Sequence, residues 1–193
     1  ENVIRNQFKI DEGDPYNEIL KNKTINNIKN LNFFRTVSSE IIEGTDSDKK
    51  IINISVTEKP TGEISAGAGV GTSGGTVTFA VRENNYLGRG IGVDTTVTIE
   101  EDSIKGSLTL NNPNFKNSNK SVFGGLQADE NDQLSSFGYK SSKTGFNIGT
   151  RFEYLENLDL GLSTSSYYED IVTNSDASAL QKKQAGDYWD TFL

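Results

Sequence analysis

Hydrophobic and polar positions alternate with a period of two through most of this chain, beginning at residues 62–71. One face of that stretch is apolar: Ile64, Ala66, Ala68 and Val70. The other face is polar or glycine: Glu63, Ser65, Gly67, Gly69 and Gly71. A period of two is the pattern of a β-strand with two unlike faces. Residues 76–82 alternate again after a short Gly/Ser/Thr turn, which predicts the first hairpin of a long antiparallel meander.

The alternation continues to the end of the chain. Its apolar rows are Ile91, Val93, Val97 and Ile99; Ile104, Leu108 and Leu110; Val122, Leu126 and Ala128; Phe146, Ile148, Phe152 and Tyr154; and Leu158, Leu160 and Leu162. A last strand is expected near Asp187. No helical pattern follows Gly62, so we predict about eight antiparallel strands of roughly 9–11 residues, the length that crosses an outer membrane at a tilt.

The connections between these strands favour a barrel. Residues 84–90, 111–117 and 155–157 give short connections, whereas 100–103, 129–136 and 171–186 are more polar and are expected to be longer. Short turns on one side and long loops on the other are typical of an outer-membrane barrel. A soluble β-sandwich also alternates and is the other fold that the pattern allows.

Residues 1–60 have a different pattern. Val3, Ile4 and Phe8 give a short helical face, and a second helix is predicted with Asp14 as its cap and Pro15 at its first position. Its apolar face is Leu20, Thr24, Ile25, Ile28 and Leu31, and it is expected to stop at Asn32. Strands are predicted over 35–43 and 50–58, the second with a buried row of Ile52, Ile54 and Val56. This order predicts a small α+β domain.

Composition excludes several kinds of chemistry. The 193 residues include no Cys and no His, so thiol chemistry and imidazole catalysis are excluded. The formal net charge of −8 argues against a nucleic-acid partner. No nucleophile–base pair or metal cluster appears in the sequence, so we expect neither an enzyme nor a cofactor.

Four other features have ordinary structural explanations. Residues 69–74 (GVGTSG) match a dinucleotide-binding pattern, but a strand rather than a helix follows them. The acidic runs 100–102 and 129–132 lack the spacing of a calcium loop and are expected to be solvated loop tips that bind cations only adventitiously. Lumenal salt bridges are expected for Arg82, Arg151 and Glu153. An interfacial aromatic girdle is expected for Tyr154, Tyr167, Tyr168, Tyr188 and Trp189.

Four short motifs resemble the POTRA–barrel superfamily. Residues 31–37 (LNFFRTV) resemble the helix-to-strand signature of POTRA domains, with Asn32 in place of the usual Gly, and residues 56–59 (VTEK) resemble the end of the last POTRA strand. Residues 85–90 (NYLGRG) and 112–115 (NPNF) resemble the turns after the second and fourth barrel strands. Their order and spacing are similar to those of the outer-membrane protein assembly factors across essentially the whole chain.

This resemblance implies a fold and a function. The fold is an α+β POTRA domain over residues 1–60, the last one and without its first strand, then a partial antiparallel transmembrane β-barrel over 61–193. The latter is roughly the first half of a barrel of about sixteen strands. The implied function is the folding and insertion of β-barrel proteins into the outer membrane of a Gram-negative cell, with the POTRA domain in the periplasm.

The resemblance also implies partners and leaves rivals open. The partners are unfolded outer-membrane β-barrel proteins, lipoproteins of the assembly machinery and outer-membrane lipid. Within the superfamily, a translocator for autotransporter assembly or two-partner secretion remains possible. Outside it, a plain porin or adhesin barrel would lack residues 1–60.

Two backbone edges are the candidate sites. The first barrel strand is expected to be a weak edge that pairs with client strands through Glu63, Ile64, Ser65, Ala66, Gly67, Ala68, Gly69, Val70 and Gly71. Three glycines and two alanines give this strand little side-chain packing, and an open edge recruits other strands. The POTRA strand is expected to bind extended segments through Thr36, Val37, Ser38, Ser39, Glu40, Ile41 and Ile42.

Overall fold

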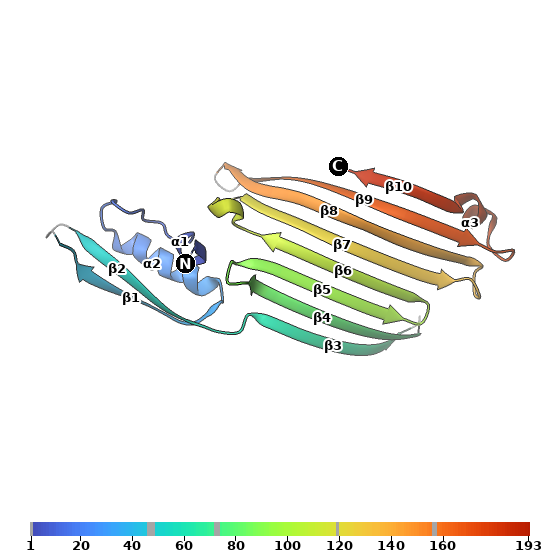
Figure 1. The fold of residues 1–193 in the computed structure, drawn as a ribbon, viewed down its shortest axis with the longest axis horizontal. Coiled ribbons are helices and arrows are strands. Elements are labelled where there is room, and N and C mark those ends of the chain that lie inside the picture. The colour runs from blue at the N-terminus through green and yellow to red at the C-terminus, as the bar shows by residue number, and fades with distance from the viewer. Residues whose placement is uncertain (1, 46–48, 72–73, 119, 156–157) are drawn as a thin grey trace. The chain divides into compact units, whose positions relative to one another are not determined.

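The alternating part of the chain folds into one eight-stranded sheet, and the part before it forms a separate unit (Figure 1). The structure is a computed structural model that describes residues 2–45, 49–71, 74–118, 120–155 and 158–193. By its internal contacts the chain divides into Glu1–Thr61 with Leu87–Arg89, and Gly62–Tyr86 with Gly90–Leu193.

The first unit contains two helices and a two-stranded antiparallel sheet. Its elements are α1 (Asn2–Arg5), α2 (Glu18–Asn30), β1 (Phe34–Glu43) and β2 (Lys50–Glu58). The buried residues of α2 are Thr24, Ile25 and Ile28, spaced as the predicted helical face requires, and Ile28 is fully buried. The row Ile52, Ile54 and Val56 is half-buried on β2. The predicted α+β unit is therefore confirmed.

Helix α2 begins three residues later than predicted. Its cap is Asn17, whose side-chain oxygen accepts hydrogen bonds from the backbone N–H groups of Ile19 and Leu20 at 2.9 and 3.1 Å. Asp14 instead accepts the backbone N–H of Asp11 at 3.0 Å in the preceding turn. Both residue types cap helices well. The prediction that Asp14 is the cap was wrong, because its carboxylate accepts a hydrogen bond in the preceding turn.

The end of α2 follows the prediction. Leu31 still has helical backbone angles, and Asn32 takes the left-handed conformation with φ 60°. Asn tolerates this region better than most residues, which explains why it can replace glycine at this point. The chain then passes directly into β1.

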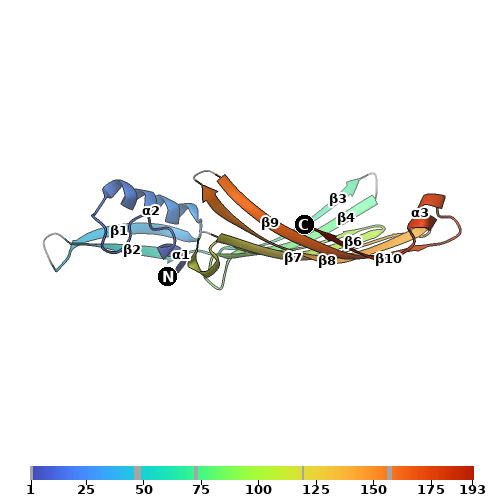
Figure 2. The same ribbon diagram turned by 90° about the horizontal axis from the view of Figure 1, so that it is seen from above.

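The second unit is an antiparallel meander. Its strands are β3 (Gly62–Gly71), β4 (Gly74–Tyr86), β5 (Ile91–Glu100), β6 (Ser103–Asn112), β7 (Lys120–Gln133), β8 (Tyr139–Leu155), β9 (Leu158–Thr173) and β10 (Gly186–Phe192). Neighbours along the chain are neighbours in the sheet, so β3 and β10 are its two edges. The sheet is curved and twisted and does not close on itself (Figure 2). This is the antiparallel, partial-barrel arrangement that the sequence predicts.

The two faces of the sheet differ as the alternation predicts. Residues opposite one another on paired strands share a face, and Ala66 lies opposite Phe79, which lies opposite Val97. Large side chains on this apolar face stay exposed: Phe79 is 52%, Leu126 59% and Leu162 68% accessible. An apolar surface of this kind needs a cover, either lipid or protein.

Two helical segments interrupt the second unit, so the expectation of no helix after Gly62 is wrong. They are a 3-10 turn, Phe115–Asn117, and α3, Ala179–Gln184. A capping box stabilises α3: Ser178 N donates to Gln181 Oε1 at 2.9 Å, and Gln181 N donates to Ser178 Oγ at 3.3 Å. The helix has six residues, which is fewer than two turns, and this is too short to leave a periodic signal.

The strands also vary more in length than expected. β4, β7, β8 and β9 have 13, 14, 17 and 16 residues, not 9–11. The additional residues put polar groups on the apolar face, for example Glu130 and Lys140, whose Oε1 and Nζ lie 2.7 Å apart. The connection at 100–103 is also short, because β5 and β6 are joined by only Glu101 and Asp102.

Candidate functional site

Strand β3 carries the pairing residues predicted from the sequence and has almost no side-chain packing. All ten of its residues are exposed, and Ile64 and Val70 are 84% and 93% accessible. No atom lies within 4 Å of a Cβ built at any of its three inward glycines: Gly67, Gly69 and Gly71. Within the described residues, no β3 side chain makes a hydrogen bond. The strand is therefore held by its backbone ladder.

That ladder occupies one side of β3. Pairing with β4 runs without a register shift from Gly62 opposite Glu83 to Gly71 opposite Gly74. On its other side, β3 pairs with no strand of the described chain. An edge strand presents a row of unpaired N–H and C=O groups, so this edge is chemically competent to accept another strand.

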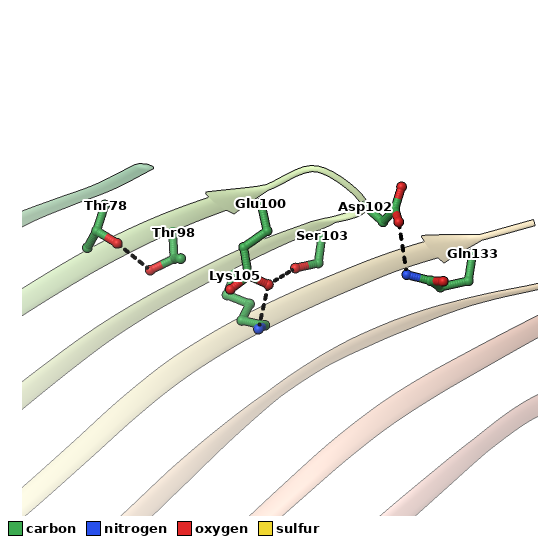
Figure 3. A network of polar contacts seen from close by, with 7 residues as sticks. All are labelled: Thr78, Thr98, Glu100, Asp102, Ser103, Lys105 and Gln133. Carbon is green, nitrogen blue, oxygen red and sulfur yellow. Dashed lines mark hydrogen bonds and ion pairs between the residues drawn. The ribbon is translucent and has the colours of Figure 1, made fainter. Parts of the chain in front are cut away.

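Strands β4 to β7 are held more firmly, because side chains join them across the polar face and at their ends. Three groups of polar contacts, with distances of 2.6–3.3 Å, are drawn in Figure 3: Thr78 with Thr98, Glu100 with Ser103 and Lys105, and Asp102 with Gln133. The first group joins β4 to β5, and the second joins β5 to β6. The third joins the β5–β6 turn to the end of β7.

A row of alternating charges crosses the polar face at the start of β3. Glu63 lies opposite Arg82, and Arg82 lies opposite Asp94. Arg82 Nε donates to Asp94 Oδ2 at 2.6 Å, and the Glu63 carboxylate also attracts the guanidinium. The predicted ion pair of Arg82 is thus present. The row itself was missed, because it depends on strand register, which the alternation alone does not give.

The predicted POTRA edge lies on β1. Residues 36–42 pair with 51–57 of β2 on one side, and no described strand pairs with β1 on the other. Within this stretch Val37 alone is half-buried, and the other six residues are exposed. The Thr36 and Thr57 hydroxyls lie 2.9 Å apart across the pair. The strand therefore has an accessible backbone edge, as its Ser/Thr-rich sequence predicts.

The predicted aromatic girdle divides between the two faces. Tyr168 and Trp189 lie opposite each other on the apolar face with ring centroids 5.6 Å apart. Tyr167 and Tyr188 are on the polar face, where Lys143 Nζ lies 4.6 Å from the centroid of the Tyr167 ring. Adjacent residues of a strand point to opposite faces, so Tyr167 and Tyr168 cannot belong to one girdle.

The acidic runs are engaged with neighbouring side chains. Glu130 and Asp132 both lie near Lys140, at 2.7 and 3.6 Å from its Nζ. Across the described residues, no three Asp or Glu side chains are grouped as metal ligands would be. Among the described residues, no helix has the length and apolar character to cross a membrane. Residues 72 and 73 of the GVGTSG match lie outside the described residues.

Comparison with a protein-family model identifies the first unit. Residues 1–59 match the POTRA model, described as "surface antigen variable number repeat". The match agrees with the motif at residues 31–37 and with the helix-to-strand passage through Asn32.

Two solved structures are similar to nearly the whole chain. BamA from Haemophilus ducreyi, lacking POTRA domains 1–3, gives a TM-score of 0.81 at 19% identity over 98% of this chain. CdiB from Acinetobacter baumannii gives a TM-score of 0.54 at 9% identity over 99%. The chain spans 39% of the length of each. Residues 1–59 therefore form a POTRA domain, and the chain as a whole has the BamA-like fold of a POTRA domain followed by part of an antiparallel β-barrel.

Proposed function

We propose that this chain is part of the core component of the machinery that folds and inserts β-barrel proteins into the outer membrane. The observation that carries the proposal is the state of β3: ten exposed residues, three glycines with empty surroundings, and a backbone edge without a described partner. Likeness in fold to BamA supports the same function.

The edge suggests how the protein acts. A strand that pairs with β3 along its free side is held by backbone hydrogen bonds with little apolar packing, because the outward row contains Ala66 and Ala68. An incoming client strand forms such hydrogen bonds by β-augmentation. Recognition by the backbone accepts many client sequences, as a general insertase requires. No covalent bond is made or broken in this process, so the proposed protein is not an enzyme and needs no cofactor.

The POTRA domain has a second edge with a complementary role. Strand β1 exposes six of the residues 36–42, and the backbone edge beside them pairs with no strand of the described residues. Under this proposal the domain lies in the periplasm and receives unfolded β-barrel clients or lipoproteins of the assembly machinery there. The exposed apolar face of the second unit, with Phe79 and Leu162, then faces the outer-membrane lipid.

A translocator of the same superfamily, for two-partner secretion or autotransporter assembly, is the second candidate. The likeness in fold to CdiB favours it, although the TM-score of 0.54 is lower than the 0.81 obtained with BamA. A plain porin or adhesin is disfavoured by the POTRA match over residues 1–59.

Site-specific crosslinking in cells tests the proposal. In the full-length protein, cysteine at Ala66 or Ala68 is expected to form disulfides with a cysteine in the terminal strand of a β-barrel client during its assembly. Ala128 is the matched control, because it lies on the same face of β7, paired on both sides by Gly106 and Thr144. Cysteine at Ala128 is expected to give no client disulfide.

The identity of the crosslinked proteins distinguishes the two candidate functions. Crosslinks to many unrelated β-barrel clients support the insertase, whereas crosslinks confined to one secreted protein support the translocator. Equal crosslinking from Ala68 and Ala128 contradicts pairing at the β3 edge.

A further inference from the structure

We propose that Glu63 selects among the strands that pair with β3, favouring a strand that carries Lys or Arg directly opposite Glu63 on the polar face. The inference rests on the proposed function, because it takes β3 to receive a strand along its free edge. It adds the side-chain chemistry and the register of that strand.

The first argument is the charge order across the sheet. Asp94, Arg82 and Glu63 stand in one row on β5, β4 and β3, with alternating signs. Asp94 is fixed from two sides, since it accepts from Arg82 Nε at 2.6 Å and from the Thr96 hydroxyl at 3.5 Å. The Arg82 Nε is directed towards Asp94, away from the edge. The row therefore ends on an exposed carboxylate at the free edge of the sheet.

The second argument is that little else on β3 can define a register. On the polar face Ser65 is followed by Gly67, Gly69 and Gly71, and none of these glycines has an atom near its Cβ position. Glycine-rich edges specify register weakly, because a slipped strand forms a similar backbone ladder. A slip by two residues keeps each side chain on its face but moves the partner of Glu63. The one charged position of the strand therefore distinguishes the correct register from the slipped ones.

The chemistry of the position points to a cation. Opposite charges directly across an antiparallel pair attract, and like charges repel. A Lys or Arg opposite Glu63 extends the alternation by one strand, whereas Asp or Glu places a second carboxylate beside the first. The pair is exposed, so its effect is a preference among strands and not an absolute requirement.

A competition experiment tests the inference. The full-length protein carries cysteine at Ala68, and synthetic peptides of one client's terminal strand carry a cysteine to match it. The peptides differ only in having Lys, Gln or Glu at the position opposite Glu63. We expect the Lys peptide to crosslink about two- to fivefold better than the Glu peptide. The preference is expected to disappear near 1 M salt, where the screening length is about 3 Å.

Two variants assign the preference to Glu63. Glu63→Gln is expected to abolish the preference for the Lys peptide, and Glu63→Lys is expected to reverse it. The control Glu153→Gln removes a carboxylate from β8, five strands from the edge, and is expected to keep the preference.

The outcomes distinguish failure of the inference about Glu63 from failure of the proposed edge pairing. If every peptide crosslinks but Glu63→Gln leaves the Lys preference intact, the inference is wrong and the proposed edge pairing stands. If no peptide crosslinks to position 68, both the edge pairing and the selection by Glu63 are contradicted.

Discussion

Arg82 and Asp94 face each other across β4 and β5, with the guanidinium Nε 2.6 Å from the carboxylate Oδ2. The pair marks a division of the sheet. From β4 to β6, neighbouring strands are joined by side chains as well as by backbone, and Asp102 of the β5–β6 turn contacts Gln133 of β7. In contrast, β3 is joined to β4 by backbone with little side-chain support. A strand that must pair with a new partner is best placed outside the region in which side chains join neighbouring strands.

The Arg82–Asp94 pair is predicted to contribute little to stability by itself. Its side chains are 60% and 37% accessible, so water and salt screen their attraction. In a double-mutant cycle of Arg82→Gln and Asp94→Asn, we expect a small favourable coupling that vanishes near 1 M salt. Denaturant unfolding of the full-length protein measures it. A coupling that is large or unaffected by salt contradicts this account.

The POTRA unit is predicted to depend on Ile28. This side chain is fully buried on α2, and truncating it leaves a cavity among the few core residues of the unit. Ile28→Ala is expected to cost about 2–5 kcal/mol, seen as faster hydrogen exchange in α2, β1 and β2 of the full-length protein. Ile19, 77% exposed on the same helix, is the control, and Ile19→Ala is expected to change exchange little.

Much of the fold could be predicted from the sequence, because it follows from local patterns. The period of two predicts which residues of a strand share a face, and Phe146 and Leu126, from two predicted apolar rows, lie on the same face of the sheet. The left-handed Asn32 was predictable because few residues tolerate that backbone conformation. The exposed glycine-rich β3 also follows directly from its sequence.

What could not be predicted depends on competition and register. Asp14 and Asn17 are equally good caps, and only the surrounding turn decides that Asn17 begins the helix. The short helix α3 depends on one capping box, which many loop sequences contain by chance. The row from Glu63 to Asp94 combines three strands, so it appears only when the register is known.

Gly138 is predicted to be essential for the connection between β7 and β8. Its φ is +75°, and an added Cβ would collide with the backbone N of Ala177 and with the side chain of Asn174. Gly138→Ala therefore combines backbone strain with overpacking and is expected to cost about 2–5 kcal/mol. Gly88 has a similar φ of +68° with nothing near its Cβ position. Gly88→Ala is expected to cost only about 1–2 kcal/mol. Equal losses of thermal stability in Gly138→Ala and Gly88→Ala would contradict the collision of the added Cβ with Ala177 and Asn174.

The POTRA edge is predicted to act through its backbone. Proline at Ser38 or Ser39 removes an N–H and restricts the strand, so Ser38→Pro or Ser39→Pro is expected to weaken crosslinking of clients or partners to residues 36–42. Ser39→Ala keeps the backbone and is expected to have no effect. Hydrogen exchange of α2 in each variant shows whether the domain remains folded. Unchanged crosslinking in a folded proline variant places recognition elsewhere in the domain.

The glycines of β3 are predicted to keep the edge weak, and filling one of them separates stability from function. Gly69 lies opposite Thr76 with no atom near its Cβ position, so Gly69→Thr fits without collision and creates a cross-strand Thr pair. Replacing the glycine also reduces the entropy lost on ordering, and together these effects are expected to stabilise the strand by about 0.5–1 kcal/mol. A β3 strand held more rigidly against β4 adapts less readily to an incoming strand, so we expect slower client insertion into liposomes.

Gly125 on β7 is the matched control for this substitution. An added Cβ there would lie 3.2 Å from the Leu108 carbonyl oxygen and closer still to the Asn147 side chain, so Gly125→Thr is expected to destabilise the sheet. The two variants thus move stability in opposite directions. If insertion simply followed stability, Gly69→Thr would insert clients at least as fast as the native protein. Slower insertion by the more stable variant is the result that assigns the weakness of β3 to function.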